Sequence, residues 1–300
     1  MIDPRHLAHL LAIHEQGSLS LAGQALNLSQ PALSNSIAVL EQRLGAPVLV
    51  RTPRGAVVNA LGAALVRRAR EMRSVLDHAG QEAMLMRRGR IGPLAVGVTP
   101  SLVGQFIPDV LELLLADLPD LSISVIEGLD GPLNEALLAG ELDVVVASVG
   151  QPNASPDILE ELLIADPFLL AVHESSALVR LPRLTLADAL NELWAVPRPG
   201  GSAYAHTQAM FLTAGVDWPK RVLSTNSVAL THQLVARMGA VALVNRVTAR
   251  GWPAPVRTIA LAEAGHRKIG LRRRRTSQAS PPVQAFTRIA AQVFERQQAG

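Results

Sequence analysis

Residues 17–45 read GSLSLAGQALNLSQPALSNSIAVLEQRLG, and this stretch decides the fold of the N-terminal part of the chain. Gly17 stops a preceding helix, and Ser18 is placed to cap a second one. Ser29 then caps a third helix, with Pro31 in its first turn, where a missing N–H is tolerated. Three short helices joined by tight turns predict a helix-turn-helix unit.

The third helix has two different faces. Its apolar face follows the helical period and consists of Leu33, Ile37, Leu40 and Leu44. At 100° per residue the opposite face is small and polar at its N-terminal end, and it carries Pro31, Ser34, Asn35, Ala38 and Gln42. We therefore expect the first face in the core and the second face against a partner.

The residues that follow predict a hairpin and then a long helix. Residues 47–58 contain two short apolar strands around a Pro/Gly turn, which is the pattern of a wing. Asn59 can cap a helix from about residue 60 to residue 88, about 40 Å long. Its apolar residues recur at spacings of three, four and seven: Leu61, Leu65, Met72, Leu76, Ala79, Ala83 and Met86. This roughly heptad seam predicts pairing with a second copy of the chain.

Composition limits the class of protein. The 300 residues are 49% apolar and 18% charged, a globular balance with room for about two domains. Cysteine is absent, which excludes disulfides, thiol catalysis and Cys-bound metals. The N-terminus has no basic region followed by an apolar one, and the apolar stretches are shorter than a membrane span. We expect a cytoplasmic protein with no membrane partner.

Charge is distributed unevenly along the chain. Residues 1–90 carry a net charge of +5, residues 91–265 carry −9 and residues 266–300 carry +7. A basic N-terminal module on an acidic body predicts a polyanionic partner for the first ninety residues. We interpret the run Arg272–Arg275 as a solvated strand edge that blocks further pairing.

From Leu94 onward, strands alternate with helices. The order is strand 94–98, helix 102–116, strand 121–126, helix 132–139 and strand 143–148, which predicts a parallel sheet covered by helices. A second lobe begins near Leu162, and a strand with Ile269 and Leu271 followed by helix 282–297 returns to the first lobe. The fold class is α/β, with two lobes that share one cleft.

The chain resembles the LysR-type transcriptional regulators. The resemblance is carried by residues 17–22, 26–34, 37, 40–41, 44–45 and 51, and further on by residues 92–97, 140–143 and 234–243. Departures at Gly23, residues 48–50 and residues 59–62 keep the same physical roles. The resemblance implies a winged helix-turn-helix at 1–59, a linker helix at 60–90 and an effector domain at 91–300. That effector domain is similar to periplasmic solute-binding proteins, with one lobe at 91–161 plus 267–300 and the other at 162–266.

As a DNA reader, the third helix would enter the major groove with its N-terminal residues nearest the bases. Gln30 can read adenine, Ser34 and Asn35 can bond bases or phosphates, and Pro31 and Ala32 can touch thymine methyls. Phosphate contacts are expected from Ser18, Ser29, Arg51 and Arg54. Two alternatives stay open. The two serines can act as helix caps alone, and the two arginines can be solvated side chains of the wing.

The effector contacts are expected where helices begin at the cleft, because free N–H groups there attract anions. Residues just before such helices are Thr99, Pro100, Ser101, Thr225 and Asn226. Arg198 can face a carboxylate with Ser202 beside it, although an exposed loop arginine explains Arg198 nearly as well. By analogy with the family, Gly128, Leu129 and Val149 line the cleft. The expected effector is a small anionic molecule.

The family resemblance further implies a homodimer or homotetramer on an interrupted palindrome, control of its own or a neighbouring promoter, and possible contact with RNA polymerase. The alternative is a solute-binding protein of the periplasmic type without a regulatory role. An enzyme is the third possibility, but no nucleophile–base pair is visible, so no catalytic residue and no cofactor are expected. His6 and His9 lie three residues apart without a further ligand, so no metal site is predicted.

Overall fold

The computed structural model describes residues 2–52, 55–87, 91–151, 155–263, 265–275 and 279–299. Contacts divide the chain into two compact units, Met1–Arg88 with Leu138–Glu141, and Gly89–Leu137 with Leu142–Gly300. Within the described ranges, no helix is long and apolar enough to cross a bilayer.

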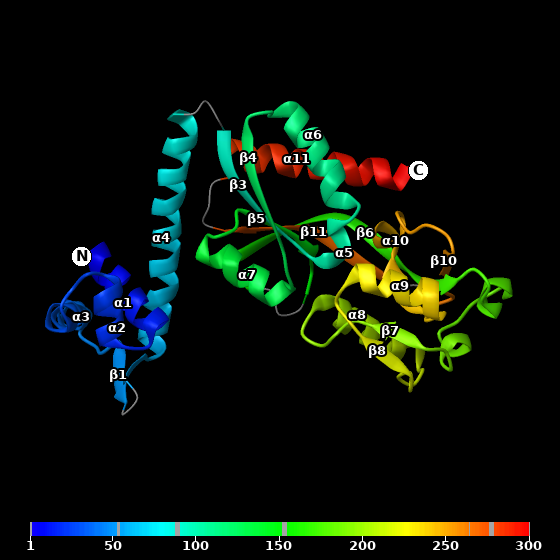
Figure 1. Cartoon of the computed structure of the whole chain (residues 1–300), viewed down its shortest axis with the longest axis horizontal. Helices are drawn as coiled ribbons and strands as arrows, with labels where there is room; N and C mark the ends of the chain where they lie inside the picture. The colour runs from blue at the N-terminus through cyan, green and yellow to red at the C-terminus, as the bar shows by residue number, and fades with distance from the viewer. Residues whose placement is uncertain are drawn as a thin grey trace. The chain divides into compact units, whose positions relative to one another are not determined.

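The first unit is a three-helix cluster with a hairpin and one long helix (Figure 1). Its elements are α1 (Pro4–Gln16), α2 (Leu19–Ala25), α3 (Gln30–Leu44), β1 (Leu49–Thr52), β2 (Gly55–Val58) and α4 (Ala60–Arg87). Strands β1 and β2 pair antiparallel, with Leu49 opposite Val58. The predicted helix-turn-helix, wing and long helix are therefore confirmed.

Local residues start and stop these helices as the sequence indicates. Gly17 and Gly45 end α1 and α3 in the left-handed conformation, at φ 64° and 70°, which glycine adopts without strain. Ser29 Oγ accepts a hydrogen bond from the Ala32 N–H at 3.3 Å. Asn59 Oδ1 accepts one from the Gly62 N–H at 2.8 Å, which confirms it as the cap of α4. Side-chain caps of this kind contribute about 1 kcal/mol each.

The core of this unit receives the predicted face of α3. Leu33, Ile37 and Leu40 are at most 4% exposed and pack with residues of α1 and with Val48. From α4, Val66 and Ala69 enter this core, two positions that the heptad pattern does not include. The seam residue Leu76, by contrast, is 64% exposed. The first half of α4 thus belongs to the domain core, and its second half leaves apolar side chains uncovered.

The second unit contains a seven-stranded sheet in the order β10-β6-β11-β5-β3-β4, with β9 on β6, and a two-stranded parallel sheet, β7-β8. The strands are β3 (Ile91–Val98), β4 (Leu121–Glu127), β5 (Val144–Ser148), β6 (Ile158–His173), β7 (Trp194–Val196), β8 (Val222–Ser224), β9 (Ala242–Asn245), β10 (Val256–Ala260) and β11 (His266–Arg274). Only β3, β4 and β5 pair parallel in the large sheet, so the expected parallel sheet is mixed instead. Strand β6 runs through the predicted lobe boundary at 161/162, which explains how one sheet serves both lobes.

Helices cover these sheets (Figure 1). They are α5 (Pro100–Val103), α6 (Phe106–Asp117), α7 (Asp130–Ala139), α8 (Ser202–Ala214), α9 (Val228–Met238), α10 (Arg246–Ala249) and α11 (Pro281–Ala299). In the first lobe α6 and α11 pack on the sheet, with Phe106 and Phe294 stacked at 3.9 Å between ring centroids. The second lobe has its own core around Trp194 and Phe211. Each lobe therefore has an independent hydrophobic centre.

The single helix predicted over 102–116 is two helices, α5 and α6. Pro108 lies in the first turn of α6. Its ring would collide with the carbonyl of Gly104 in a continuous helix, so the chain breaks at Gly104 and Gln105 and restarts. This break leaves α5 as a single short turn, which begins directly after Thr99 and contains Ser101.

Arg272 contradicts the interpretation of Arg272–Arg275 as a solvated edge. Strand β11 lies between β6 and β5, so it is interior to the sheet. Arg272 is 3% exposed and donates to Glu160 and Asp130, at 3.0 Å each. A buried guanidinium with two carboxylate partners is an internal ionic network. The sequence reading failed because strand order, which decides what lies next to β11, is nonlocal.

Candidate DNA-binding and effector-binding sites

The polar face of α3 is exposed along its length. Gln30, Pro31, Ala32 and Asn35 are exposed, and Ser34 is partly buried. These side chains lie at the N-terminal end of a helix whose other face is fixed in the core. The structure thus brings the predicted base-reading residues onto one accessible surface.

A hydrogen bond orients Gln30. The Ser20 hydroxyl of α2 donates to Gln30 Oε1 at 3.2 Å. An amide can give one acceptor and one donor to the Hoogsteen edge of adenine, and a neighbour that restrains its rotamer lowers the entropy lost on binding. Ser20 was not among the predicted contacts. Its position in the first turn of α2, the helix that precedes the reading helix, is the signal that could have identified it.

The two capping serines behave differently. Ser29 caps α3 with its side chain, whereas Ser18, at the start of α2, makes no side-chain cap hydrogen bond. The Ser18 hydroxyl is therefore available for another acceptor. Arg51 lies in β1, but its side chain and the whole of Arg54 lie outside the described residues.

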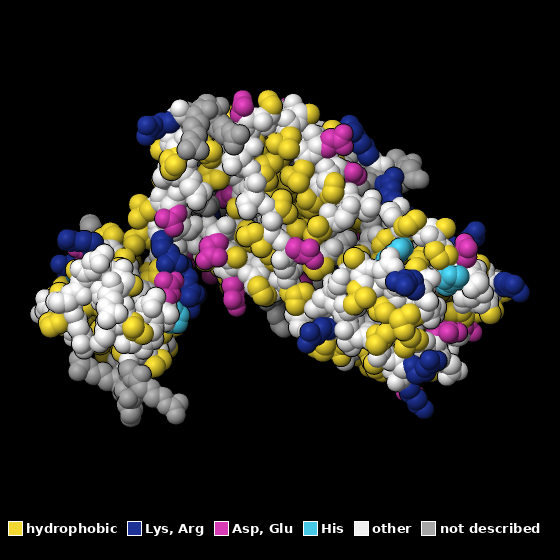
Figure 2. Space-filling view, viewed as in Figure 1, with side chains coloured by type: hydrophobic (Ala, Val, Ile, Leu, Met, Phe, Trp, Pro, Cys, Tyr) yellow, Lys and Arg dark blue, Asp and Glu magenta, His cyan; other side chains and the backbone are white. Residues whose placement is uncertain are grey.

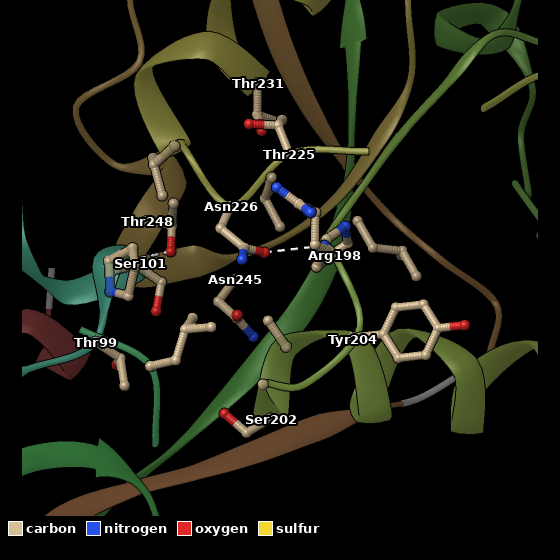
Figure 3. Close-up of a pocket in the computed structure, with 18 of the residues that line it drawn as sticks. Thr99, Ser101, Arg198, Ser202, Tyr204, Thr225, Asn226, Thr231, Asn245 and Thr248 are labelled. Atoms are coloured by element: carbon tan, nitrogen blue, oxygen red, sulfur yellow. Dashed lines mark hydrogen bonds between the residues drawn. The ribbon is translucent and has the colours of Figure 1, made fainter. Parts of the chain in front are cut away.

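In the second unit, most of the predicted effector contacts line one cavity (Figure 3). The cavity has a volume of about 100 Å³. Its lining includes Thr99, Pro100, Ser101, Arg198, Ser202, Thr225 and Asn226. Asn226 Oδ1 accepts from the Arg198 N–H at 2.9 Å, which ties two of these loops together. Ser227 Oγ caps α9 by accepting from the Leu230 N–H at 3.2 Å.

Two predicted positions do not reach the cavity. Gly128 packs on Leu133, and a Cβ at Gly128 would lie 3.2 Å from that side chain. Val149 is 5% exposed and packs against Gly270. Neither belongs to the cavity lining, whereas Leu129 does.

The cavity also has lining residues that the sequence analysis missed: Asn245, Thr248, Trp252 and Arg267. Arg267 lies two positions before Ile269 and four before Leu271 in β11, and both of these are buried. A period of two along a strand places all three on the same face. That alternation was the available signal for a buried arginine.

Arg267 is held only partly by its neighbours. It is 3% exposed, its Nη1 donates to Ser101 Oγ at 2.6 Å, and its Nη2 lies 3.6 Å from Asp166 Oδ2. Burial raises the pKa of Asp166 above its ordinary value, and Arg267 opposes that rise. Burial lowers the pKa of Arg267 to about 10, so the guanidinium keeps its charge at neutral pH.

A hydrogen bond to a carboxylate joins the two lobes beside the cavity. Asp130, at the start of α7, accepts from the Ser202 N–H at 3.0 Å and from Arg272 Nη1 at 3.0 Å. Ser202 is the first residue of α8, so Asp130 supplies a carboxylate to the positive end of that helix dipole. The cavity wall therefore includes a polar bridge that depends on the separation of the lobes.

Within the described part of the chain, no group of three or more His, Asp or Glu side chains is arranged to hold a metal ion. The cavity lining combines hydroxyls, amides and guanidinium groups with apolar walls. Such a lining suits the binding of a small organic molecule.

A helix-turn-helix with an exposed reading face, followed by a two-lobed domain with a polar cavity, defines a DNA-binding protein that also carries a small-molecule receptor. Residues 4–63 match the family described as bacterial regulatory helix-turn-helix protein, lysR family, and residues 87–295 match the LysR substrate binding domain. The chain belongs to the LysR family and is a DNA-binding transcriptional regulator with an effector-binding domain.

Individual proteins agree with this assignment. The HTH-type transcriptional regulator GbpR of Rhizobium radiobacter is 30% identical over 241 residues, covering 79% of each chain. The DNA-binding transcriptional dual regulator OxyR of Escherichia coli is 26% identical, over 78% of this chain and 76% of its own. Among solved structures, full-length CbnR complexed with its target DNA has a TM-score of 0.64 at 22% identity, covering 97% of this chain and 99% of that one. These sequence relatives are named as transcriptional regulators rather than enzymes.

Proposed function

We propose that this regulator reads operator bases with the N-terminal end of α3 and controls that binding through an effector in the cavity of its second unit. The base contacts are Gln30, Pro31, Ala32, Ser34 and Asn35, with Ser18, Ser29, Arg51 and Arg54 on phosphates. The supporting observation is the exposure of the Gln30 amide at the start of a helix whose opposite face is buried.

The effector site consists of Thr99, Pro100, Ser101, Arg198, Ser202, Thr225 and Asn226 around one cavity. An effector that binds one arrangement of the lobes better than another shifts the population between them by its differential affinity. Ser101 acts as a binding residue, because its hydroxyl is hydrogen bonded to a guanidinium, which is not a base. The effector domain therefore has a receptor role rather than a catalytic one.

The working form is an oligomer that acts in the cytoplasm, where the DNA is. Val75 and Leu76, 65% and 64% exposed on α4, are the surface for pairing with a second copy. Hydrophobic side chains also gather on the face of the first lobe that Figure 2 shows. The exposed apolar residues of this lobe include Leu115, Val125 and Ile126. Two such surfaces support a dimer that can pair again into a tetramer on two half-sites. The domain division is 1–59, 60–90 and 91–300, and contact with RNA polymerase would follow from promoter binding.

Substitution of Gln30 tests the reading role. A duplex selected by the wild-type chain from a random library serves as operator, and a scrambled duplex serves as non-specific DNA. Gln30→Ala is expected to weaken operator binding by about 1 to 3 kcal/mol and to leave non-specific binding unchanged, because a base contact discriminates by that amount. The measurement is fluorescence anisotropy at fixed salt.

Gln42→Ala is the matched control. Gln42 is exposed on the same helix, about 18 Å further along its axis. It should leave operator affinity unchanged, because it lies away from the N-terminal end. Equal losses on operator and scrambled DNA, or equal losses in the two variants, contradict the assignment of Gln30 as a base reader.

A further inference from the structure

The cavity contains buried polar atoms without hydrogen-bond partners within the described residues. They are Thr99 Oγ1, Asn245 Nδ2, and Arg267 Nε and Nη2. The three side chains are 6%, 6% and 3% exposed, and all three line the same cavity. A buried polar atom that lacks a partner costs free energy, so three residues of this kind around one space indicate a missing ligand group.

These atoms come from separate elements. Thr99 follows β3, Asn245 ends β9, and Arg267 lies in β11. The guanidinium and amide nitrogens are donors only, and a hydroxyl can also donate. The group that satisfies them must therefore accept several hydrogen bonds, and a guanidinium donor favours an acceptor with a negative charge.

Asp166 limits how much negative charge the site accepts. It lies behind Arg267, 3.6 Å from Nη2, so the pair is close to neutral before a ligand binds. Asp166 Oδ2 also lacks a hydrogen-bond partner, and its distance of 3.6 Å from Nη2 is longer than a hydrogen bond, so Asp166 balances the charge of Arg267 but leaves Nε and Nη2 unsatisfied. A monoanion completes the guanidinium, whereas a dianion such as sulfate would add a second negative charge near Asp166.

The remaining walls define the rest of the ligand. Ala195, Leu243 and Trp252 line the same cavity. A planar carboxylate matches the guanidinium fork with two parallel hydrogen bonds. We propose that the effector is a small monocarboxylic acid whose carboxylate binds Arg267, Thr99 and Asn245 and whose apolar body packs on these walls. This inference rests on the cavity being the effector site, and it replaces Arg198 with Arg267 as the carboxylate anchor.

The test uses the full chain and defined probes: acetate, propionate and benzoate, their primary amides, and sulfate, all at equal ionic strength. The carboxylates are expected to raise the melting temperature of the second unit, and the amides and sulfate are not. Isothermal titration of the strongest carboxylate should show affinity about tenfold to a hundredfold lower in Arg267→Met, the range expected for lost charge-assisted hydrogen bonds.

Two further variants keep the result interpretable. Asp166→Asn combined with Arg267→Met removes both buried charges and serves if the single variant does not fold. Arg198→Met tests the competing arginine at the edge of the cavity and should lower carboxylate affinity much less than Arg267→Met does.

Several outcomes overturn the inference. If carboxylates bind Arg267→Met as tightly as the wild-type chain, Arg267 is not the carboxylate anchor. If amides or sulfate bind as tightly as carboxylates, the effector is not defined by a carboxylate. Both results leave the cavity as a receptor site. If Arg198→Met loses as much carboxylate affinity as Arg267→Met, Arg198 is an equal anchor of the carboxylate. Absence of stabilisation by any of the carboxylates also counts against the inference. The proposed regulatory function fails separately, by loss of operator discrimination in the Gln30 experiment.

Discussion

Thr99 shows how a single residue can serve binding at the expense of stability. Its hydroxyl is buried at the end of β3, caps nothing in α5 and has no partner within the described residues. Burying a hydroxyl without a hydrogen bond costs about 1 to 3 kcal/mol. A residue kept for a ligand is expected to destabilise the ligand-free protein in this way.

Thr99→Val is therefore expected to raise the free energy of unfolding of the second unit by about 1 kcal/mol, because valine fills the same volume without a polar atom. Urea unfolding followed by tryptophan fluorescence measures it, since all three tryptophans, Trp194, Trp218 and Trp252, lie in this unit. Thr207→Val is the control. Thr207 is also buried, but its hydroxyl donates to the Ala203 carbonyl at 2.9 Å. Loss of this hydrogen bond should lower the free energy of unfolding of the second unit by about 1 kcal/mol. Destabilisation by both substitutions would show that Thr99 has a structural partner.

Residue roles set by the local chain were predictable, and roles set by distant contacts were not. Ser29 and Asn59 were identified as caps because a cap is defined by the next three residues. Arg267 was missed because its partners, Ser101 and Asp166, are 166 and 101 positions away in the sequence. Val149 was placed in the cleft by family analogy, whereas its contact with Gly270 takes it elsewhere.

At the scale of elements, the start of α4 is fixed by close packing on the wing. A Cβ on Gly62 would collide with the Val48 carbonyl oxygen, which is backbone and cannot rotate away. A Cβ on Gly80, in the same helix, meets nothing within 4 Å. The same substitution should therefore have opposite effects at the two ends of one helix.

Gly62→Ala is expected to destabilise the first unit by about 1 to 3 kcal/mol through overpacking. Gly80→Ala should stabilise α4 by up to about 1 kcal/mol through helix propensity. Hydrogen–deuterium exchange of the α1 and β1 amides measures both effects. Unchanged protection in Gly62→Ala would mean that the start of α4 does not pack closely against the Val48 carbonyl.

The elements themselves were predicted well where one residue determines them. Gly17 ends α1 as expected, but the break between α5 and α6 was not predicted. Pro108 carried that information, because a proline in a first turn implies a helix start nearby. Helix α10 and strand β10 have no strong pattern of their own and were missed.

At the scale of the whole molecule, the second unit shows why lobe boundaries are hard to derive from sequence. Strand β6 is sixteen residues long and pairs with β11, β9 and β10. A single strand therefore crosses from one lobe to the other, and no composition change marks the crossing. The βαβαβ order predicted the parallel pairing of β3, β4 and β5 correctly, but the antiparallel β11 depends on a return of the chain from more than 100 residues away.

Binding of operator DNA through α3 is the property on which the regulatory role of this chain depends. The most direct measurement is footprinting and salt-dependent binding of the full chain on the DNA upstream of its own coding sequence. We expect protection of two half-sites, and an affinity whose logarithm falls steeply and linearly with the logarithm of the salt concentration, because Arg–phosphate contacts release counterions. Failure of the folded, oligomeric chain to bind any duplex in a salt-dependent manner would contradict it.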